Sequence, residues 1–250
     1  ALQHAHKIWL KINTGMNRLG FPPQRLSVLL GEARSSVQLS LQGVMTHFSC
    51  ADEEDTEGFR QQLKQVQQLC GLLPKGVDFS AANSAVVLLH SNLCFQWVRP
   101  GISLYGGSPV GASQGEQFGL RPAMKLVSKI IACRDLSQGD AVGYGASWQA
   151  PGPLRMGVVA AGYGDGYPRQ IGSGSPVWVD GRETQIIGRV SMDMVTVDLT
   201  GIPSATVGSP VLLWGGGLSV DRVARCANTI SYHLLTGVTR RVPRRYQGAG

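Results

Sequence analysis

The chain has 250 residues, 43% of them hydrophobic, and a formal net charge of +7, which indicates a globular protein of one large or two ordinary domains. No apolar run reaches the roughly 18 to 20 residues of a membrane span, and residues 1–4 lack the start of a signal peptide, so we expect a cytoplasmic protein. The basic residues are mostly dispersed, which favours an anionic small ligand over nucleic acid. The five cysteines follow no metal-ligand spacing, so we expect reduced thiols and no metal site.

The first hundred residues alternate apolar runs with helical patterns. Strands are predicted at residues 8–12, 39–47, 77–82 and 95–99, and helices at residues 22–34, 56–73 and 84–90. Strands that alternate with helices predict a parallel sheet, curled toward a barrel or doubly wound.

The sequence after Ala123 changes to runs of period two that are separated by glycine-rich turns. These runs predict strands at residues 124–131, 155–161, 176–179, 185–190, 195–199 and 210–213. They suit a small antiparallel barrel or sandwich, followed by a helix at residues 219–235. We take residues 111–117 as the boundary loop and expect two domains, residues 1–120 and residues 121–250.

Polar residues follow every predicted strand of the first domain, where parallel α/β folds carry their chemistry. They are Thr14, Gly15, Met16 and Arg18 after the first strand, His47 at the end of the second, Asn83 and Ser84 after the third, and Arg99 and Gly101 after the fourth. Any one of them is more often a structural or capping residue. Polar residues after four successive strands, all at the same edge of the sheet, favour a binding site. Arg99 lies beside the junction of the two domains, a favoured place for such a site.

Eight motifs, each weak alone, occur here in an order that resembles the alanine racemases, fold-type III enzymes that use pyridoxal phosphate. They are Lys11-Ile-Asn-Thr-Gly-Met-Asn-Arg18, Thr46-His47-Phe48, Ala82-Asn83-Ser84, Arg99-Pro-Gly101-Ile102-Ser-Leu-Tyr105-Gly, Gly143-Tyr144-Gly145-Ala146, Gly162-Tyr163-Gly-Asp165-Gly-Tyr167, Arg189-Val-Ser191-Met192-Asp193 and Val242-Pro-Arg244-Arg-Tyr246. The resemblance implies the later half of a (β/α)8 TIM-type barrel followed by an antiparallel β domain.

The resemblance also implies which residues bind the cofactor. Asn83, Ser84, Gly101, Ile102 and Tyr246 match the family's cofactor-binding positions, and hydroxyls and free amides of this kind suit a phosphate. Arg99 would face the pyridine nitrogen. Because a guanidinium does not give up its proton, it would leave that nitrogen unprotonated and weaken the ring as an electron sink.

Four further positions match residues that bind substrate or orient the site. Arg18 and the backbone N–H of Met192 would bind the carboxylate of alanine. His47 would orient Arg99 and the catalytic tyrosine. In the family the lysine equivalent to Lys11 is often carbamylated, which makes an anion that positions the arginine; Asn13 stands where many relatives carry aspartate.

Racemisation needs two bases on opposite faces of a planar intermediate, and the family uses a tyrosine and the cofactor lysine. Tyr144 matches the tyrosine. In the family, the residues equivalent to Tyr144 and Met192 come from the partner subunit. The resemblance therefore implies a homodimer with shared active sites that converts L-alanine and D-alanine and supplies D-alanine for peptidoglycan.

The cofactor lysine has no match among the six lysines of the chain. A full barrel takes about 250 residues and about 120 precede the β-rich part, so we expect a partial barrel that is inactive alone. Three explanations stay open: a split gene with a separate amino-terminal fragment, an incomplete sequence of a normal enzyme, and a remnant with only a structural or binding role. The intact motifs favour the first two.

The alternative functions are a non-catalytic cofactor-binding or interaction module and a fold-type III amino-acid decarboxylase.

Overall fold

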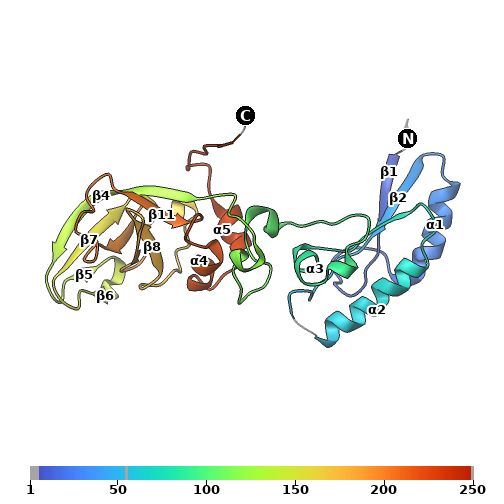
Figure 1. Ribbon diagram of the computed structural model, residues 1–250, viewed down its shortest axis with the longest axis horizontal. Coiled ribbons are helices and arrows are strands. Elements are labelled where there is room, and N and C mark those ends of the chain that lie inside the picture. Colours follow the sequence, from blue (N-terminus) through green and yellow to red (C-terminus); the bar gives the residue numbers. More distant parts are fainter. Residues whose placement is uncertain (1–5, 54–55, 249–250) are drawn as a thin grey trace. The chain divides into compact units, whose positions relative to one another are not determined.

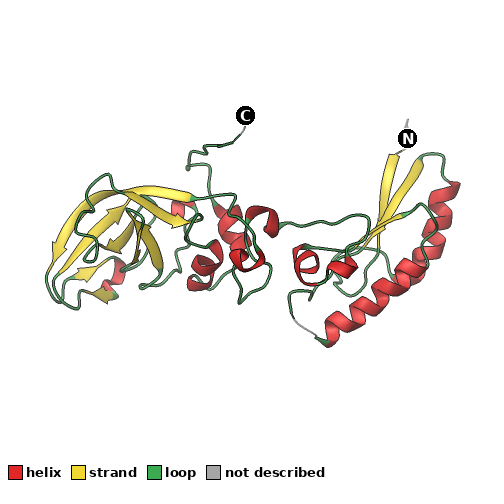
Figure 2. Ribbon diagram, in the orientation of Figure 1, coloured by secondary structure: helices red, strands yellow, loops and turns green. Residues whose placement is uncertain are grey.

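A computed structural model describes residues 6–53 and 56–248 of the chain (Figure 1). The chain divides into two compact units, residues 1–103 (unit 1) and residues 104–250 (unit 2). Unit 1 combines helices with a parallel sheet, and unit 2 is rich in antiparallel strands (Figure 2). No helix in the described ranges is long and apolar enough to cross a membrane. Residues 1–4, on which the expected absence of a signal peptide rests, lie outside the described residues.

The sheet of unit 1 has three parallel strands in the order β1-β2-β3. The strands are β1 (His6–Lys11), β2 (Leu39–Met45) and β3 (Asp78–Ser80). The helices are α1 (Leu26–Ser35), α2 (Glu57–Gly71) and α3 (Ser84–Leu89), with the 3-10 helices η1 (Pro23–Arg25) and η2 (Ser91–Leu93). Apolar residues at helical spacing on α1 and α2 pack with the strands in one core. The predicted alternation of strands and helices is confirmed up to α3.

The strand predicted at residues 95–99 is wrong. Trp97 forms only an isolated parallel bridge with Ser80. The Phe79 N–H donates to the side-chain oxygen of Gln96 at 3.0 Å, so a side chain takes the position that a backbone carbonyl would hold in a strand ladder. This segment therefore runs beside β3 without extending the sheet.

Unit 2 contains a six-stranded antiparallel sheet in the order β10-β7-β4-β11-β8-β9. Its strands are β4 (Leu126–Leu136), β7 (Leu154–Val159), β8 (Pro176–Val179), β9 (Arg182–Gln185), β10 (Val195–Asp198) and β11 (Pro210–Trp214). An isolated bridge between Ile186 and Val197 connects the two ends of the sheet, which closes it as a small barrel, one of the two architectures predicted.

Short elements join the strands of unit 2. A small hairpin, which the sequence did not predict, pairs β5 (Ala141–Val142) with β6 (Trp148–Gln149). The 3-10 helices are η3 (Ile102–Tyr105), which begins within unit 1, and η4 (Gly115–Phe118), η5 (Tyr144–Ala146) and η6 (Tyr163–Asp165). Residues 111–117, the expected boundary loop, lie inside unit 2.

The strand predicted at residues 185–190 lies earlier in the chain, as β9. Asp180, with a φ of 49°, and Gly181, with a φ of 75°, form the turn between β8 and β9. An Asp-Gly pair is typical of such hairpins, because both residues tolerate positive φ. After β9 the chain turns at Gly188, which has a φ of 73° and where a Cβ would lie 2.9 Å from the carbonyl oxygen of Val142.

The single helix predicted at residues 219–235 is wrong, because two helices occupy that segment. They are α4 (Val220–Cys226) and α5 (Ser231–Gly237). Asn228 has a φ of 50° just after α4, and the Thr229 N–H donates back to Ala224 O at 3.0 Å. Asparagine tolerates this left-handed conformation, which ends the first helix.

Asp221, in the first turn of α4, connects distant segments of unit 2. Its carboxylate is 5% exposed and accepts hydrogen bonds from Ser108 N at 3.1 Å, from Gly115 N at 2.9 Å and from the Ser231 hydroxyl. One buried carboxylate thereby joins the segment before β4 to both helices. Such a group is stable in the interior only because donors surround it.

We expect Asp221→Ala to lower the free energy of unfolding by about 3 kcal/mol, because the buried N–H groups of Ser108 and Gly115 would lose their acceptor. Urea unfolding of the chain measures the change. Asp140→Ala is the control, since it removes one exposed acceptor, that of Ser137 N, and should cost less than about 0.5 kcal/mol. Equal losses in the two variants would contradict the connecting role of Asp221.

Candidate active site

Arg99 is bound at the carboxyl ends of β2 and β3. Its Nη2 donates to Thr46 O at 2.6 Å, its Nη1 donates to the Ser80 hydroxyl, and its backbone N–H donates to Ala82 O at 2.8 Å. The side chain is half-buried, and this burial lowers the pKa of Arg99 from its ordinary value. A guanidinium nevertheless stays protonated in proteins, so Arg99 is a fixed cation and hydrogen-bond donor.

His47 lies against this guanidinium, with Nδ1 3.3 Å from Nη2 of Arg99. A guanidinium can only donate, so Nδ1 accepts and the ring proton resides on Nε2. Burial, followed by the positive charges of Arg99, Arg18 and Lys11, lowers the pKa of His47. His47 is therefore neutral near neutral pH and offers an Nε2–H donor.

Gln62 on α2 is a site residue that the sequence analysis missed. Its amide is 2% exposed; Nε2 donates to Thr14 Oγ1 at 3.0 Å and to His47 O at 2.6 Å, and Oε1 accepts from Ser49 N at 3.0 Å. The Thr14 and Thr46 hydroxyls in turn lie 2.6 Å apart. The signal was present, because Gln62 is the polar residue on the otherwise apolar side of α2 formed by Phe59, Val66 and Leu69.

Two cations act on His47 from the carboxyl end of β1: Lys11 is its last residue and Arg18 lies in the loop that follows. Asn13 shapes this loop, since its Oδ1 accepts from Gly15 N at 3.1 Å and from Asn17 N at 2.9 Å. Within the described residues neither Lys11 nor Arg18 has a carboxylate partner. These unpaired positive charges suit an anionic ligand.

Ser84 gathers backbone donors at the start of α3. Its buried hydroxyl accepts from Gly101 N at 2.9 Å and from Ser103 N at 3.4 Å, which leaves its own proton free to donate. The Ser103 hydroxyl is buried and has no partner among the described residues. A Cβ added at Gly101 would meet nothing within 4 Å. Two hydroxyl donors beside open space fit a phosphate group.

Asn83 and Ile102, the other two residues of unit 1 that were predicted to bind the cofactor, have side chains that contact the protein itself. Asn83 caps α3, because its Oδ1 accepts from Val86 N at 3.1 Å, and its Nδ2 donates to Phe48 O at 3.3 Å. The side chain of Ile102 is buried, 3% exposed. Asn83 therefore connects the Ser84 turn to the strand end that carries His47.

Tyr144, Met192 and Tyr246 belong to unit 2, and each has an exposed side chain. Tyr144 is 71% exposed in η5, between glycines whose φ angles of 77° and 75° form the turn. The guanidinium of Arg189 packs over this turn, 3.0 Å from a Cβ added at Gly145. Met192 is 51% exposed and Tyr246 is 85% exposed.

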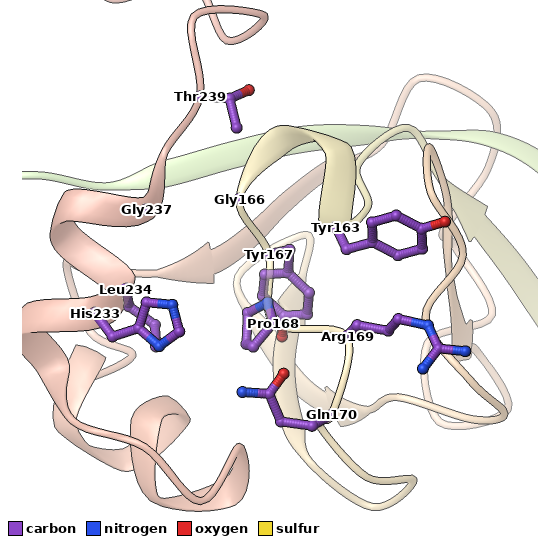
Figure 3. A pocket seen from close by; sticks show the side chains of 10 residues that line it. All are labelled: Tyr163, Gly166, Tyr167, Pro168, Arg169, Gln170, His233, Leu234, Gly237 and Thr239. Carbon is purple, nitrogen blue, oxygen red and sulfur yellow. The ribbon is translucent and has the colours of Figure 1, made fainter.

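A cavity of about 250 Å³ opens in unit 2 between η6 and α5. Figure 3 shows Tyr163 and Arg169 on one side of the turn at Tyr167, and His233 and Leu234 on the other. Tyr167 is 1% exposed, and burial, followed by the neighbouring Cys226, raises its pKa. Its phenol is therefore held neutral, unlike a tyrosine that exchanges protons with a substrate.

Two family models match the chain. "Alanine racemase, N-terminal domain" matches residues 1–109, and "Alanine racemase, C-terminal domain" matches residues 123–246. The two domains agree with the predicted order of an α/β barrel part followed by a β domain. The assignment of the strands of unit 1 to the later half of the barrel stays a prediction.

Curated relatives and solved structures agree with these matches. The chain is 52% identical over 241 residues to the alanine racemase of Hahella chejuensis, covering 95% of this chain and 64% of that protein. It is 48% identical to the biosynthetic alanine racemase of Pseudomonas aeruginosa, covering 96% and 66%. The crystal structure of biosynthetic alanine racemase from Pseudomonas aeruginosa matches with a TM-score of 0.93 and 46% identity over 99% of this chain and 68% of that one.

The chain spans 64% and 66% of the length of those two curated relatives. The resemblance predicted from the eight motifs is confirmed by the family models, the relatives and the solved structure together. The chain belongs to the alanine racemase family.

Proposed function

We propose that this chain takes part in the interconversion of L-alanine and D-alanine, an isomerase reaction with pyridoxal 5'-phosphate as cofactor. The observation that carries the proposal is Arg99, bound at two strand ends beside the neutral His47. When bound, pyridoxal phosphate supplies an electron-withdrawing ring that acidifies the α-proton of alanine. Decarboxylation is not favoured, because the relatives and solved structures reported above are all named alanine racemases.

Arg99 would direct its remaining N–H groups to the ring nitrogen of the cofactor. Thr46 O and the Ser80 hydroxyl fix the plane of the guanidinium, so this donor has one orientation. Because a guanidinium keeps its proton, Arg99 would donate a hydrogen bond to that nitrogen without protonating it. By leaving that nitrogen unprotonated, Arg99 would favour return of the proton to Cα over side reactions.

Ser84 and Ser103 would bind the phosphate of the cofactor. Both hydroxyls have a proton to donate, and the Ser103 hydroxyl has no partner among the described residues. We propose that the phosphate is also bound by the residues that match the family's phosphate-binding motifs, Gly101, Ile102 and Tyr246. Hydroxyl and amide donors bind phosphate without adding charge to the site.

Arg18 and the backbone N–H of Met192 would bind the carboxylate of alanine. Arg18 and Lys11 already act on His47 as positive charges, so they lie at the part of the site where an anion is favoured. A carbamylated Lys11 would add a negative charge that orients Arg18.

Tyr144 would move a proton at Cα from one face, and a lysine would do so from the other. The phenol of Tyr144 is 71% exposed on unit 2, as expected for a side chain that completes the site of another subunit. We therefore propose a homodimer with shared active sites. Its D-alanine would supply peptidoglycan synthesis in the cytoplasm.

Arg99→Lys, in enzyme complemented with the lysine-bearing segment, is expected to raise the fraction of transamination product on the order of tenfold, because a titratable ammonium can protonate the ring nitrogen. Pyruvate formation per racemisation event measures this fraction. Arg34→Lys, on the exposed end of α1, is the control. Equal fractions in the two variants and the parent enzyme would argue against this role for Arg99.

Tyr144→Phe is expected to slow deuterium exchange at Cα of L-alanine on the order of 100-fold or more, while exchange of D-alanine survives better, because each base faces one enantiomer. Proton NMR in deuterium oxide follows both exchanges. Tyr163→Phe, in a similar Gly-Tyr-Gly turn, should affect the two enantiomers alike. Symmetric losses in Tyr144→Phe would refute its assignment to one face.

The 250-residue chain alone is expected to racemise alanine at least about 100-fold more slowly than a complete relative, because it offers no lysine in the cofactor position. Borohydride reduction with pyridoxal phosphate should label none of its lysines, which are Lys7, Lys11, Lys64, Lys75, Lys125 and Lys129. The Pseudomonas aeruginosa enzyme is the positive control. Rapid racemisation with a label on Lys11, the lysine beside His47, would overturn this expectation.

A further inference from the structure

The backbone around Met192 is held by the turn η6. Tyr163 N donates to Ser191 O at 3.1 Å, and Gly164 N donates to Met192 O at 2.8 Å. Glycine is required at this contact, because a Cβ at Gly162 would lie 2.3 Å from Ser191 O. The carbonyl of Met192 is thus fixed, while its N–H has no acceptor within the part of the chain that the structure describes.

Arg241 connects the two segments of this contact. Its Nη2 lies 2.5 Å from Asp193 Oδ1, and its Nε lies 3.3 Å from Asp165 Oδ1. The guanidinium also packs on Gly164, where an added Cβ would be 2.3 Å from Nη1. One planar group therefore contacts the residue after Met192 and the turn that holds Met192.

The chain just before Arg241 is itself attached to η6. Thr239 Oγ1 donates to Gly164 O at 2.9 Å, and Thr239 N donates to Asp165 O at 3.1 Å. The second carboxylate oxygen of Asp165 accepts from Gly162 N at 2.9 Å. The backbone that carries Arg241 is thus fixed. Its guanidinium can therefore hold Asp193, the residue after Met192, in one position.

We propose that Arg241 is a positioning residue that bridges Asp165 and Asp193 and thereby aims the free N–H of Met192 at the carboxylate of the substrate. This inference rests on the proposed function, in which Met192 binds that carboxylate. The side chains of Arg241 and Asp193 are 47% and 55% exposed, and ion pairs this exposed contribute little to global stability. The effect of Arg241 is therefore on loop orientation.

The test compares Arg241→Gln with Arg222→Gln. Arg222 forms a bidentate pair with Glu183 at 2.7 and 2.6 Å, is 42% exposed, and lies on α4, which makes it a matched control. Amide hydrogen exchange of the 250-residue chain is measured over residues 161–166 and 190–195. Arg241→Gln should speed exchange there by about tenfold, with the strands β4 and β7 unchanged, while Arg222→Gln matches the parent chain.

A second readout uses the complemented enzyme. Arg241→Gln should raise the KM for alanine by roughly fivefold to tenfold with kcat changed by less than about twofold, and Arg241→Lys should recover part of the loss. Unchanged exchange in Arg241→Gln, or equal increases in both variants, would overturn the inference. Faster exchange with an unchanged KM would overturn the claim that Arg241 aims the Met192 N–H at the substrate carboxylate. A parent enzyme without racemase activity would count against the proposed function, and the exchange data would then decide alone on Arg241.

Discussion

The arrangement of unit 1 depends on satisfying a half-buried guanidinium. Arg99 needs acceptors in several directions at once, and they come from Thr46 at the end of β2 and from Ser80 at the end of β3. If either strand end moved, a charged donor would remain partly buried without a partner, which is costly. The same contacts fix the direction in which the remaining N–H groups of the Arg99 guanidinium point. The stability of this unit and the geometry of its site therefore depend on the same hydrogen bonds.

Burial and the charges around Arg99 also determine the protonation state of its neighbour His47. Partial burial, followed by the charges of three cations, lowers the pKa of His47 and keeps it neutral, which makes its Nε2 a donor and its Nδ1 an acceptor for Arg99. A protonated His47 would lose that acceptor and add a fourth positive charge. The positive potential that suits an anionic ligand thus also maintains the hydrogen-bond pattern that holds the arginine.

Local patterns explain which features the sequence could predict. Apolar spacing gave α1 and α2, and the rule that chemistry lies at strand ends brought Arg99 and His47 into one group, which the structure joins by a 3.3 Å contact. The failures depend on tertiary contacts or on single residues: the Gln96 side chain replaces a strand partner, and Asn228 divides one helical pattern into two. Asp221 was missed because its backbone donors, Ser108 N and Gly115 N, lie more than 100 residues away in the sequence.

Gln62 has a consequence for how α2 can be oriented about its own axis. Purely apolar contacts would tolerate a small rotation of the helix, since one aliphatic surface fits another nearly as well. The amide of Gln62 allows no such freedom, because it has matched donors and acceptors on Thr14, His47 and Ser49. A slip of one residue would turn it by about 100° about the helix axis, away from these partners, and leave its hydrogen bonds unmade. Gln62 therefore fixes the rotation of α2 about its axis. An apolar residue of similar volume at this position would remove that constraint and allow the helix to adopt more than one rotation.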